Sequence, residues 1–226
     1  MKYKNIKRAK FLERPNRFVA YIEMDGKREI CHVKNTGRCK ELLIPGVTIY
    51  VQSADNPNRK TPYDLIAVNK GDRIVNIDSQ VPNKVFAEWV RDKEVFGGLT
   101  LLRPEKVFAN SRFDFYLEAG GRKIFVEVKG VTLEEKGVAL FPDAPTERGI
   151  KHIQELEQAV LEGYEAYIFF IIQMKGIKYF SPNYQTHQAF GDALVKAARN
   201  GVKVLAFDCD VTPDSITAGD YIDVKF

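Results

Sequence analysis

The chain has 226 residues, of which 45% are hydrophobic and 28% are charged, a balance that can bury one sizeable core or two small ones. This composition excludes a mainly disordered, collagen-like or coiled-coil protein. No stretch approaches the roughly 20 apolar residues of a membrane span, so we expect no membrane partner. The basic first ten residues lack the apolar run of about 7 to 15 residues that marks a secretory signal, which predicts a cytoplasmic protein.

Cysteine and histidine are too few for a disulfide framework or a histidine-rich metal site. The sequence has three of each, and the cysteines form no Cys-x-x-Cys pair. A bound metal would therefore be held mainly by carboxylate oxygens, which favours Mg²⁺, Mn²⁺ or Ca²⁺.

The formal net charge of +4 hides an asymmetry between the two parts of the chain. Residues 1–80 carry 16 Lys and Arg against 9 Asp and Glu, whereas the remainder carries 18 against 21. A basic first part attracts polyanions such as DNA. A solvated surface of Lys and Arg would explain the same composition.

Residues 7–78 consist of short segments rich in β-branched and aromatic residues, separated by turn signals. Apolar residues alternate over 18–23, and Asp25-Gly26 then turns the chain into 28–33, which predicts a hairpin. A short helix is expected over 38–43, after the turn Asn35-Thr36-Gly37, and a strand over 48–52. Residues 1–80 are therefore expected to form an OB-like β-barrel, with an SH3-like barrel as the alternative.

From residue 81 the apolar periodicity becomes helical, and we expect a second domain over 81–226 with a mixed sheet flanked by helices, an α+β or α/β fold. Asn83 is the expected N-cap of the first helix and Thr146 that of the second. In chain order, the pattern predicts a helix at 83–95, strands at 111–118 and 123–129 joined by Gly120-Gly121, a helix at 146–162, a strand at 166–172, a helix at 183–200, a strand at 202–207 and a strand pair within 216–226.

Two of these strands bring carboxylates and an ammonium together. Successive side chains of a strand point to opposite faces, so Glu127 and Lys129 share a face. Asp114 lies on the preceding strand and would approach Glu127 across the hairpin. Two carboxylates hold a hard divalent cation, and an adjacent ammonium can orient the water that attacks a phosphodiester.

This arrangement resembles the PD-(D/E)xK nuclease motif, with Asp114, Glu127 and Lys129 at the matching positions and Phe113 in place of the proline. The resemblance implies that the two acids bind Mg²⁺ or Mn²⁺ and that the lysine is catalytic. Such nucleases often carry a further acid on the first helix, for which Glu88 is preferred over Glu94. The order of helices and strands also resembles the α-β-β-β-α-β core of that superfamily.

Nearly the whole chain resembles the sugar fermentation stimulation protein family. The resemblance is carried by the segments 35–38, Pro45-Gly46, 111–115, 127–133 (EVKGVTL) and 141–152 (FPDAPTERGIKH). It implies an OB-like N-terminal domain, a C-terminal domain of the PD-(D/E)xK type, and DNA binding linked to the control of sugar-utilisation (maltose-type) genes. It does not by itself imply cleavage.

DNA is the expected partner, and its contacts are assigned to basic side chains in both domains. At i, i+4 on the helix 146–162, Arg148 and His152 would hold a phosphate beside the metal, although a solvated helix face is the simpler alternative. The predicted contacts are Arg38, Lys40, Arg59, Lys60, Arg112, Arg148 and His152. We expect a metal-dependent DNA nuclease, with a non-cleaving DNA-binding regulator as the alternative and an RNA-binding protein ranked third. The sequence does not decide whether the chain forms a homodimer.

Overall fold

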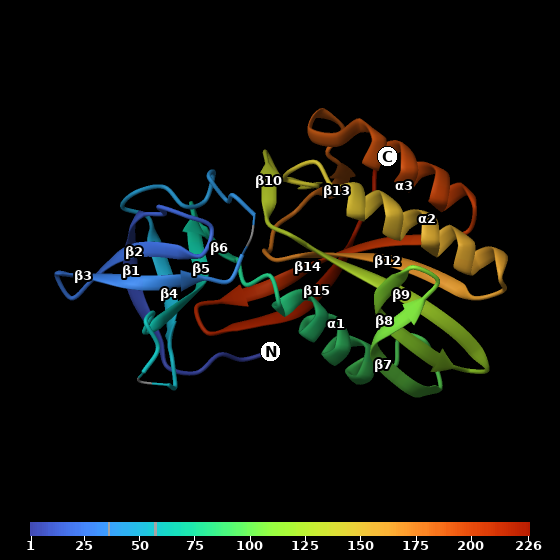
Figure 1. Cartoon of the computed structure of the whole chain (residues 1–226), viewed down its shortest axis with the longest axis horizontal. Coiled ribbons are helices and arrows are strands. Elements are labelled where there is room, and N and C mark those ends of the chain that lie inside the picture. The colour runs from blue at the N-terminus through green and yellow to red at the C-terminus, as the bar shows by residue number, and fades with distance from the viewer. Residues whose placement is uncertain (36, 57) are drawn as a thin grey trace.

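A computed structural model describes residues 1–226 except Thr36 and Pro57. Thr36 of the expected turn 35–37, and Pro57, one of the turn signals within residues 7–78, thus lie outside the described residues. Figure 1 shows two lobes, an N-terminal barrel and a larger domain built on a twisted sheet, with the N-terminal segment reaching across to α1 (Val81–Asp92).

The first lobe is the expected barrel. Its strands are β1 (Ile6–Glu13), β2 (Val19–Met24), β3 (Lys27–Val33), β4 (Thr48–Ser53), β5 (Tyr63–Lys70) and β6 (Arg73–Asn76). They follow the order β3-β2-β1-β4-β5-β6, and a parallel pairing of β3 with β5 closes the ring. This closed order confirms the OB-type prediction. The predicted β2–β3 hairpin is also confirmed, and its turn places Asp25 and Gly26 at φ 52° and 73°, the left-handed pair that such tight turns need.

The helix expected over 38–43 is wrong. The chain makes only one turn there, in which the backbone N–H groups of Leu42 and Leu43 both donate to the carbonyl of Cys39. Cys39 itself has a positive φ of 47°, outside the right-handed helical region, and Pro45 follows too soon for a second turn.

The second lobe contains the helices and the remaining strands. They are α1, β7 (Leu99–Phe108), β8 (Ser111–Ala119), β9 (Arg122–Val131), β10 (Leu133–Glu135), β11 (Val138–Phe141), α2 (Glu147–Leu161), β12 (Glu165–Ile172), β13 (Tyr179–Pro182), α3 (Tyr184–Arg199), β14 (Lys203–Thr212) and β15 (Ser215–Ile222). The main sheet has the order β15-β14-β12-β9-β8-β7, with β9, β12 and β14 parallel. In Figure 1, α1 covers one face of this sheet and α2 and α3 cover the other. The mixed sheet flanked by helices is as predicted.

Three details of this domain differ from the prediction. The edge strand β7 was not predicted, because most of its side chains are exposed and Pro104 interrupts it. The strand pair expected within 216–226 is wrong, since β15 pairs antiparallel with β14 instead. A small sheet β10-β11-β13 lies beside the main one, and its strands are too short to show a periodic pattern.

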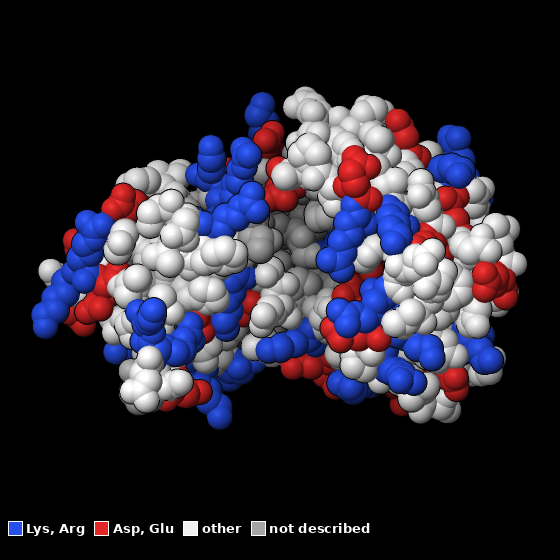
Figure 2. Space-filling model, in the orientation of Figure 1, with Lys and Arg blue, Asp and Glu red and all other residues white. Residues whose placement is uncertain are grey.

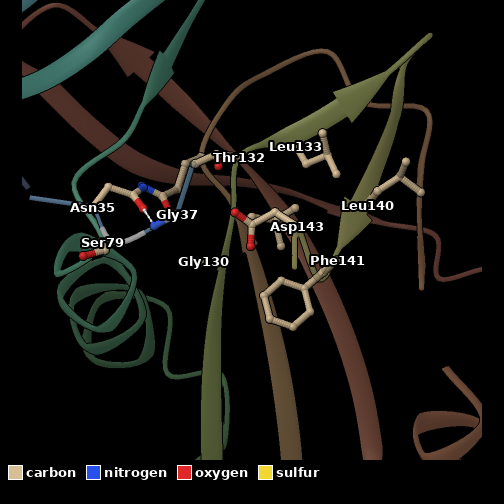
Figure 3. A pocket seen from close by; sticks show the side chains of 11 residues that line it. Asn35, Gly37, Ser79, Gly130, Thr132, Leu133, Leu140, Phe141 and Asp143 are labelled. Atoms are coloured by element: carbon tan, nitrogen blue, oxygen red, sulfur yellow. Dashed lines mark hydrogen bonds between the residues drawn. The ribbon is translucent and has the colours of Figure 1, made fainter. Parts of the chain in front are cut away.

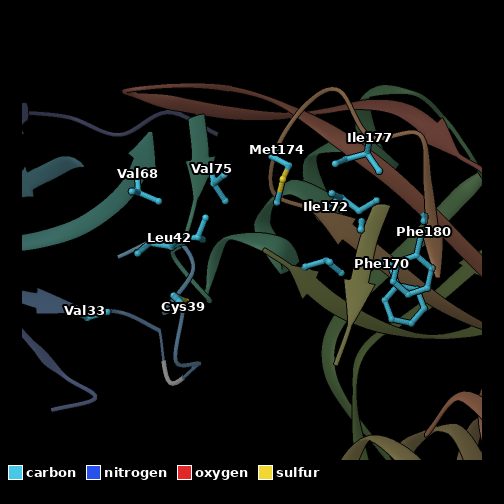
Figure 4. Packing of buried hydrophobic residues seen from close by; sticks show 14 of the residues in the cluster. Val33, Cys39, Leu42, Val68, Val75, Phe170, Ile172, Met174, Ile177 and Phe180 are labelled. Carbon is cyan, nitrogen blue, oxygen red and sulfur yellow. The ribbon is translucent and has the colours of Figure 1, made fainter. Parts of the chain in front are cut away.

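Apolar packing joins the lobes. One cluster of buried residues contains Val33 and Leu42 of the barrel together with Ile172, Met174 and Phe180 of the second lobe (Figure 4). Because the cluster crosses between the lobes, sliding them apart would expose apolar surface, at a cost of roughly 25 cal/mol per Å².

Hydrogen bonds between buried polar groups also fix how the two lobes are oriented. The Gln173 side-chain amide donates to the carbonyls of Asn76 and Asp78 at 3.0 and 3.2 Å, and the Asn76 backbone N–H donates to the Gln173 carbonyl at 2.9 Å. Lys70 of the barrel donates to the Glu134 carboxylate of β10 at 2.6 Å. The barrel is thus held in one orientation beside the end of β9.

Candidate metal centre

The hairpin of β8 and β9 brings Asp114 to the backbone that follows Glu127. The strand pairing runs from Ala119–Arg122 to Phe115–Val126 and stops there. Beyond this last residue pair, the backbone N–H of Val128 donates to Oδ2 of Asp114 at 2.8 Å. The carboxylate therefore occupies the point where the two strands separate.

Glu127 is nearly fully buried, with 2% of its surface exposed. Its Oε1 atom accepts hydrogen bonds from Lys129 Nζ and His152 Nδ1, each at 2.5 Å. Its Oε2 atom is buried and has no hydrogen-bond partner among the described residues. An unpaired buried carboxylate oxygen is costly, so Oε2 is the atom of this site that requires a further ligand.

The imidazole of His152 holds Glu127 from the α2 side. Arg148 Nε lies 3.4 Å from His152 Nε2. Because a guanidinium only donates, Nε2 is the acceptor of this hydrogen bond. The ring hydrogen is therefore on Nδ1, which donates it in the hydrogen bond to Glu127 Oε1. His152 is 5% exposed and packs edge-on against Phe113. The prediction that His152 contacts DNA is corrected accordingly, because both ring nitrogens already have protein partners.

Asn83 is not the N-cap of α1, contrary to the prediction. The N-cap of α1 is Gln80, with Pro82 in the first turn, so Asn83 lies inside the helix. Its Nδ2 donates to Asp114 Oδ1 at 2.8 Å. Asn83 thus orients the first carboxylate, a role for which the sequence offers no signal beyond its place in the first turn.

Glu88 does not join this cluster. It lies five positions after Asn83, which places it about 140° further round the helix at 100° per residue. Its carboxylate accepts from the ammonium of Met1 at 2.6 Å. The alternative acid, Glu94, is exposed and follows the end of α1. The structure therefore gives no support to a third carboxylate from α1.

The two carboxylates of the site have opposite pKa shifts. Burial raises the pKa of Asp114, and the negative charge of Glu127 adds to the rise. Burial also acts to raise the pKa of Glu127, but the hydrogen bond from His152 and the positive charge of Lys129 outweigh it and bring that pKa below its usual range. Glu127 is therefore the more firmly ionised of the pair.

These donors suit a hard cation. Among the described residues, no group of three or more His, Cys, Asp or Glu is placed to hold a metal, so the protein ligands would be the carboxylates of Asp114 and Glu127. An all-oxygen set of two carboxylates that leaves room for water is typical of Mg²⁺ and Mn²⁺. The unpaired Oε2 of Glu127 fits this requirement.

A pocket of about 160 Å³ continues from the end of β9 into the contact between the lobes. It is lined by Asn35 and Gly37 of the barrel and by Gly130, Thr132 and Asp143 of the second domain (Figure 3). The Asp143 side chain points across the pocket toward Gly37, where an added Cβ would lie 2.7 Å from Asp143 Oδ2. The pocket thus begins one residue beyond Lys129.

The predicted DNA contacts fall into two groups. Arg38, Lys40, Lys60, Arg112 and Arg148 are exposed. Arg112 lies 3.6 Å from Glu105, whose negative charge offsets the positive charge of the guanidinium. Arg59 donates to the buried carboxylate of Asp64 at 2.8 and 3.1 Å and stabilises the barrel. Figure 2 shows Lys and Arg side chains on both rims of the hollow between the lobes.

Comparison with known proteins decides the family. Residues 12–77 match the SfsA N-terminal OB domain and residues 80–215 match the sugar fermentation stimulation protein RE domain. The chain belongs to the sugar fermentation stimulation protein family. Within the described part of the chain, no helix is long and apolar enough to cross a membrane.

Relatives match over nearly their full length. A sugar fermentation stimulation protein homolog of Desulfitobacterium hafniense is 69% identical over 100% of this chain and 98% of its own. One from Clostridium beijerinckii is 58% identical over 99% of both chains. The solved structure of Pyrococcus furiosus SfsA in complex with Ca²⁺ is 28% identical, with a TM-score of 0.90 over 100% of this chain and 98% of that one.

Proposed function

We propose that this protein is a DNA nuclease that hydrolyses phosphodiester bonds with Mg²⁺ or Mn²⁺ and acts in the cytoplasm. The observation that carries the proposal is the buried, unpaired Oε2 of Glu127, on a carboxylate already fixed by Lys129 and His152. A structural salt bridge has no need of such an oxygen. The Ca²⁺ bound by the Pyrococcus furiosus relative supports a divalent cation here.

Each residue has a definite part in this proposal. Asp114 and Glu127 would hold the cation, which supplies positive charge to the phosphate oxygens in the transition state. Lys129 Nζ, at 17% side-chain exposure and beside Glu127, would orient the attacking water through a hydrogen bond from its ammonium. Arg148, exposed at the start of α2, would hold the neighbouring phosphate.

The test is cleavage of labelled single-stranded, duplex and branched DNA with Mg²⁺ or Mn²⁺. We expect Glu127→Gln to abolish cutting and Lys129→Ala to reduce it about 100-fold or more, while both variants keep their DNA affinity in EDTA. Lys123→Ala is the matched control, since Lys123 is exposed on the same strand. If wild type and variants bind equally and none cuts any substrate, the non-cleaving regulator of sugar-utilisation genes takes the place of the nuclease.

A further inference from the structure

The barrel carries a basic groove with an apolar floor. The groove has a volume of about 610 Å³ and lies where the β1–β2 turn meets the β3–β4 connection. Its lining contains four basic side chains and one acidic side chain: Arg14, Arg17, Arg38, Lys40 and Glu13. Phe11, Leu43 and Pro45 supply its apolar part.

The positive charge of this groove is available to a ligand. Arg17, Arg38 and Lys40 are exposed and form no ion pair within the described residues. The acidic Glu13 is already matched by Arg28 at 2.6 Å. Arg14 has a structural part, because its guanidinium donates to the carbonyls of Arg17, Asn35, Gly37 and Arg38. Among the described residues, the groove thus carries three basic side chains that no acidic group neutralises.

Two large apolar side chains are exposed next to these lining residues. Phe18 follows Arg17 and is 58% exposed, and Ile44 stands between Leu43 and Pro45 and is 57% exposed. Each follows a residue that lines the groove, so phosphates bound in the groove would contact the cations while flat bases contact the apolar side chains at its edge. A duplex hides its base faces, whereas a single strand offers them for stacking.

The groove also leads toward the candidate metal centre. Gly37 lines both the groove and the pocket between the lobes, and that pocket is lined at its other side by Gly130, the residue after Lys129. A strand held in the groove would therefore continue past Gly37 toward the end of β9, the strand that carries Lys129.

We propose that this groove binds single-stranded DNA through Arg17, Arg38 and Lys40 on the phosphates and Phe18 and Ile44 on the bases, and that it delivers the strand to the site of cleavage. The proposal rests on the proposed nuclease function, because it makes a single-stranded segment the part of the substrate that the enzyme recognises.

The stacking contact is tested by fluorescence anisotropy with a labelled 20-nucleotide oligo(dT) and a duplex of the same length, in EDTA so that no cleavage is needed. We expect Phe18→Ala to weaken single-strand binding about fivefold or more and Phe18→Trp to preserve it. Leu161→Ala is the control, since Leu161 is 80% exposed at the end of α2. Unchanged affinity of both Phe18→Ala and Ile44→Ala, or equal binding of the duplex by wild type, would overturn the proposal.

The phosphate contacts are tested by salt dependence. For single strands, each neutralised phosphate contributes about −0.7 to the slope of log affinity against log salt. Replacing Arg38 and Lys40 by Ala should therefore reduce the slope by about 1.4, while Lys196→Ala with Arg199→Ala on α3 should leave it unchanged. An equal effect of both pairs would mean that charge alone, and not the groove, binds DNA. Loss of groove binding with cleavage retained would refute this proposal and leave the nuclease intact.

Discussion

The imidazole of His152 provides the sharpest test of how the proposed metal centre is built. Its Nδ1 donates to Glu127 Oε1 at 2.5 Å, and its Nε2 is occupied by Arg148. An Asn side chain places an amide near the position of Nδ1, whereas a Gln side chain reaches the position of Nε2. His152→Asn should therefore keep Glu127 oriented, and His152→Gln should not.

The size of the effect follows from the bond that is lost. A hydrogen bond to a charged group contributes about 1.5 to 3 kcal/mol, and removing a residue that orients a metal ligand lowers metal affinity about 10- to 100-fold. We expect this loss in His152→Ala and His152→Gln, and a loss of only a few-fold in His152→Asn. Because Lys129 still donates to Oε1, the carboxylate is not left wholly unpaired.

The assay is calorimetric titration of each variant with Mn²⁺, accompanied by thermal unfolding in EDTA. Unfolding separates a general loss of stability from a loss of metal affinity, since a residue that only supports the fold would shift the melting temperature of His152→Asn and His152→Gln alike. Equal Mn²⁺ affinity of wild type and His152→Ala would refute the assigned orientation, and so would a better rescue by Gln than by Asn.

Two further predictions concern acidic residues outside the centre. Burial acts to raise the pKa of Glu134, but hydrogen bonds from Lys70 and the Gly137 backbone outweigh it and hold the pKa below its usual 4.5; this stabilisation is therefore complete above pH 4.5 and disappears as the pH falls through the lower folded value. Glu134→Gln should lower the free energy of unfolding by about 1.5 to 3 kcal/mol at pH 7, with a smaller difference from wild type in urea titrations at pH 3; a constant difference would contradict the linkage. Glu88→Gln should leave Mn²⁺ affinity within about twofold of wild type, since Asn83 and not Glu88 faces Asp114; a loss as large as that of Glu127→Gln would place Glu88 among the ligands.

The long elements of this fold could be predicted because their burial is either periodic or continuous. The apolar stripe of helix α2 begins after Thr146, whose side chain accepts from the Gly149 backbone N–H, and β12 is buried along almost its whole length. The prediction fails where burial follows neither pattern. The strand β7 is an exposed edge, and the backbone just before Cys39 is held by a distant side chain, since the Arg14 guanidinium donates to the carbonyls of Gly37 and Arg38.

The site was predictable only in part for a related reason. A charged residue within an apolar strand is visible in the sequence, and Asp114, Glu127 and Lys129 were found in this way. Their orienting partners are set by how distant elements dock. The sequence predicts that His152 lies near the site and binds a phosphate. No local pattern shows that the His152 ring on α2 instead faces Glu127 of β9.

Asn83 shows how docking supplies a function that sequence alone does not, and it can be tested in two opposite directions. Asn83→Ala removes the donor to Asp114 Oδ1 and leaves the Val128 N–H in place, so Mn²⁺ affinity should fall about 5- to 10-fold, the equivalent of roughly 1 kcal/mol. Asn83→Asp adds a carboxylate to the same position, which should destabilise the metal-free protein through repulsion of Asp114 and strengthen Mn²⁺ binding through an extra oxygen ligand. Lys84→Ala, at the exposed neighbouring position, is the control. If both Asn83 variants bind Mn²⁺ as wild type does, Asn83 has no part in the metal centre, and the carboxylate of Asp114 is held by the β8–β9 backbone alone.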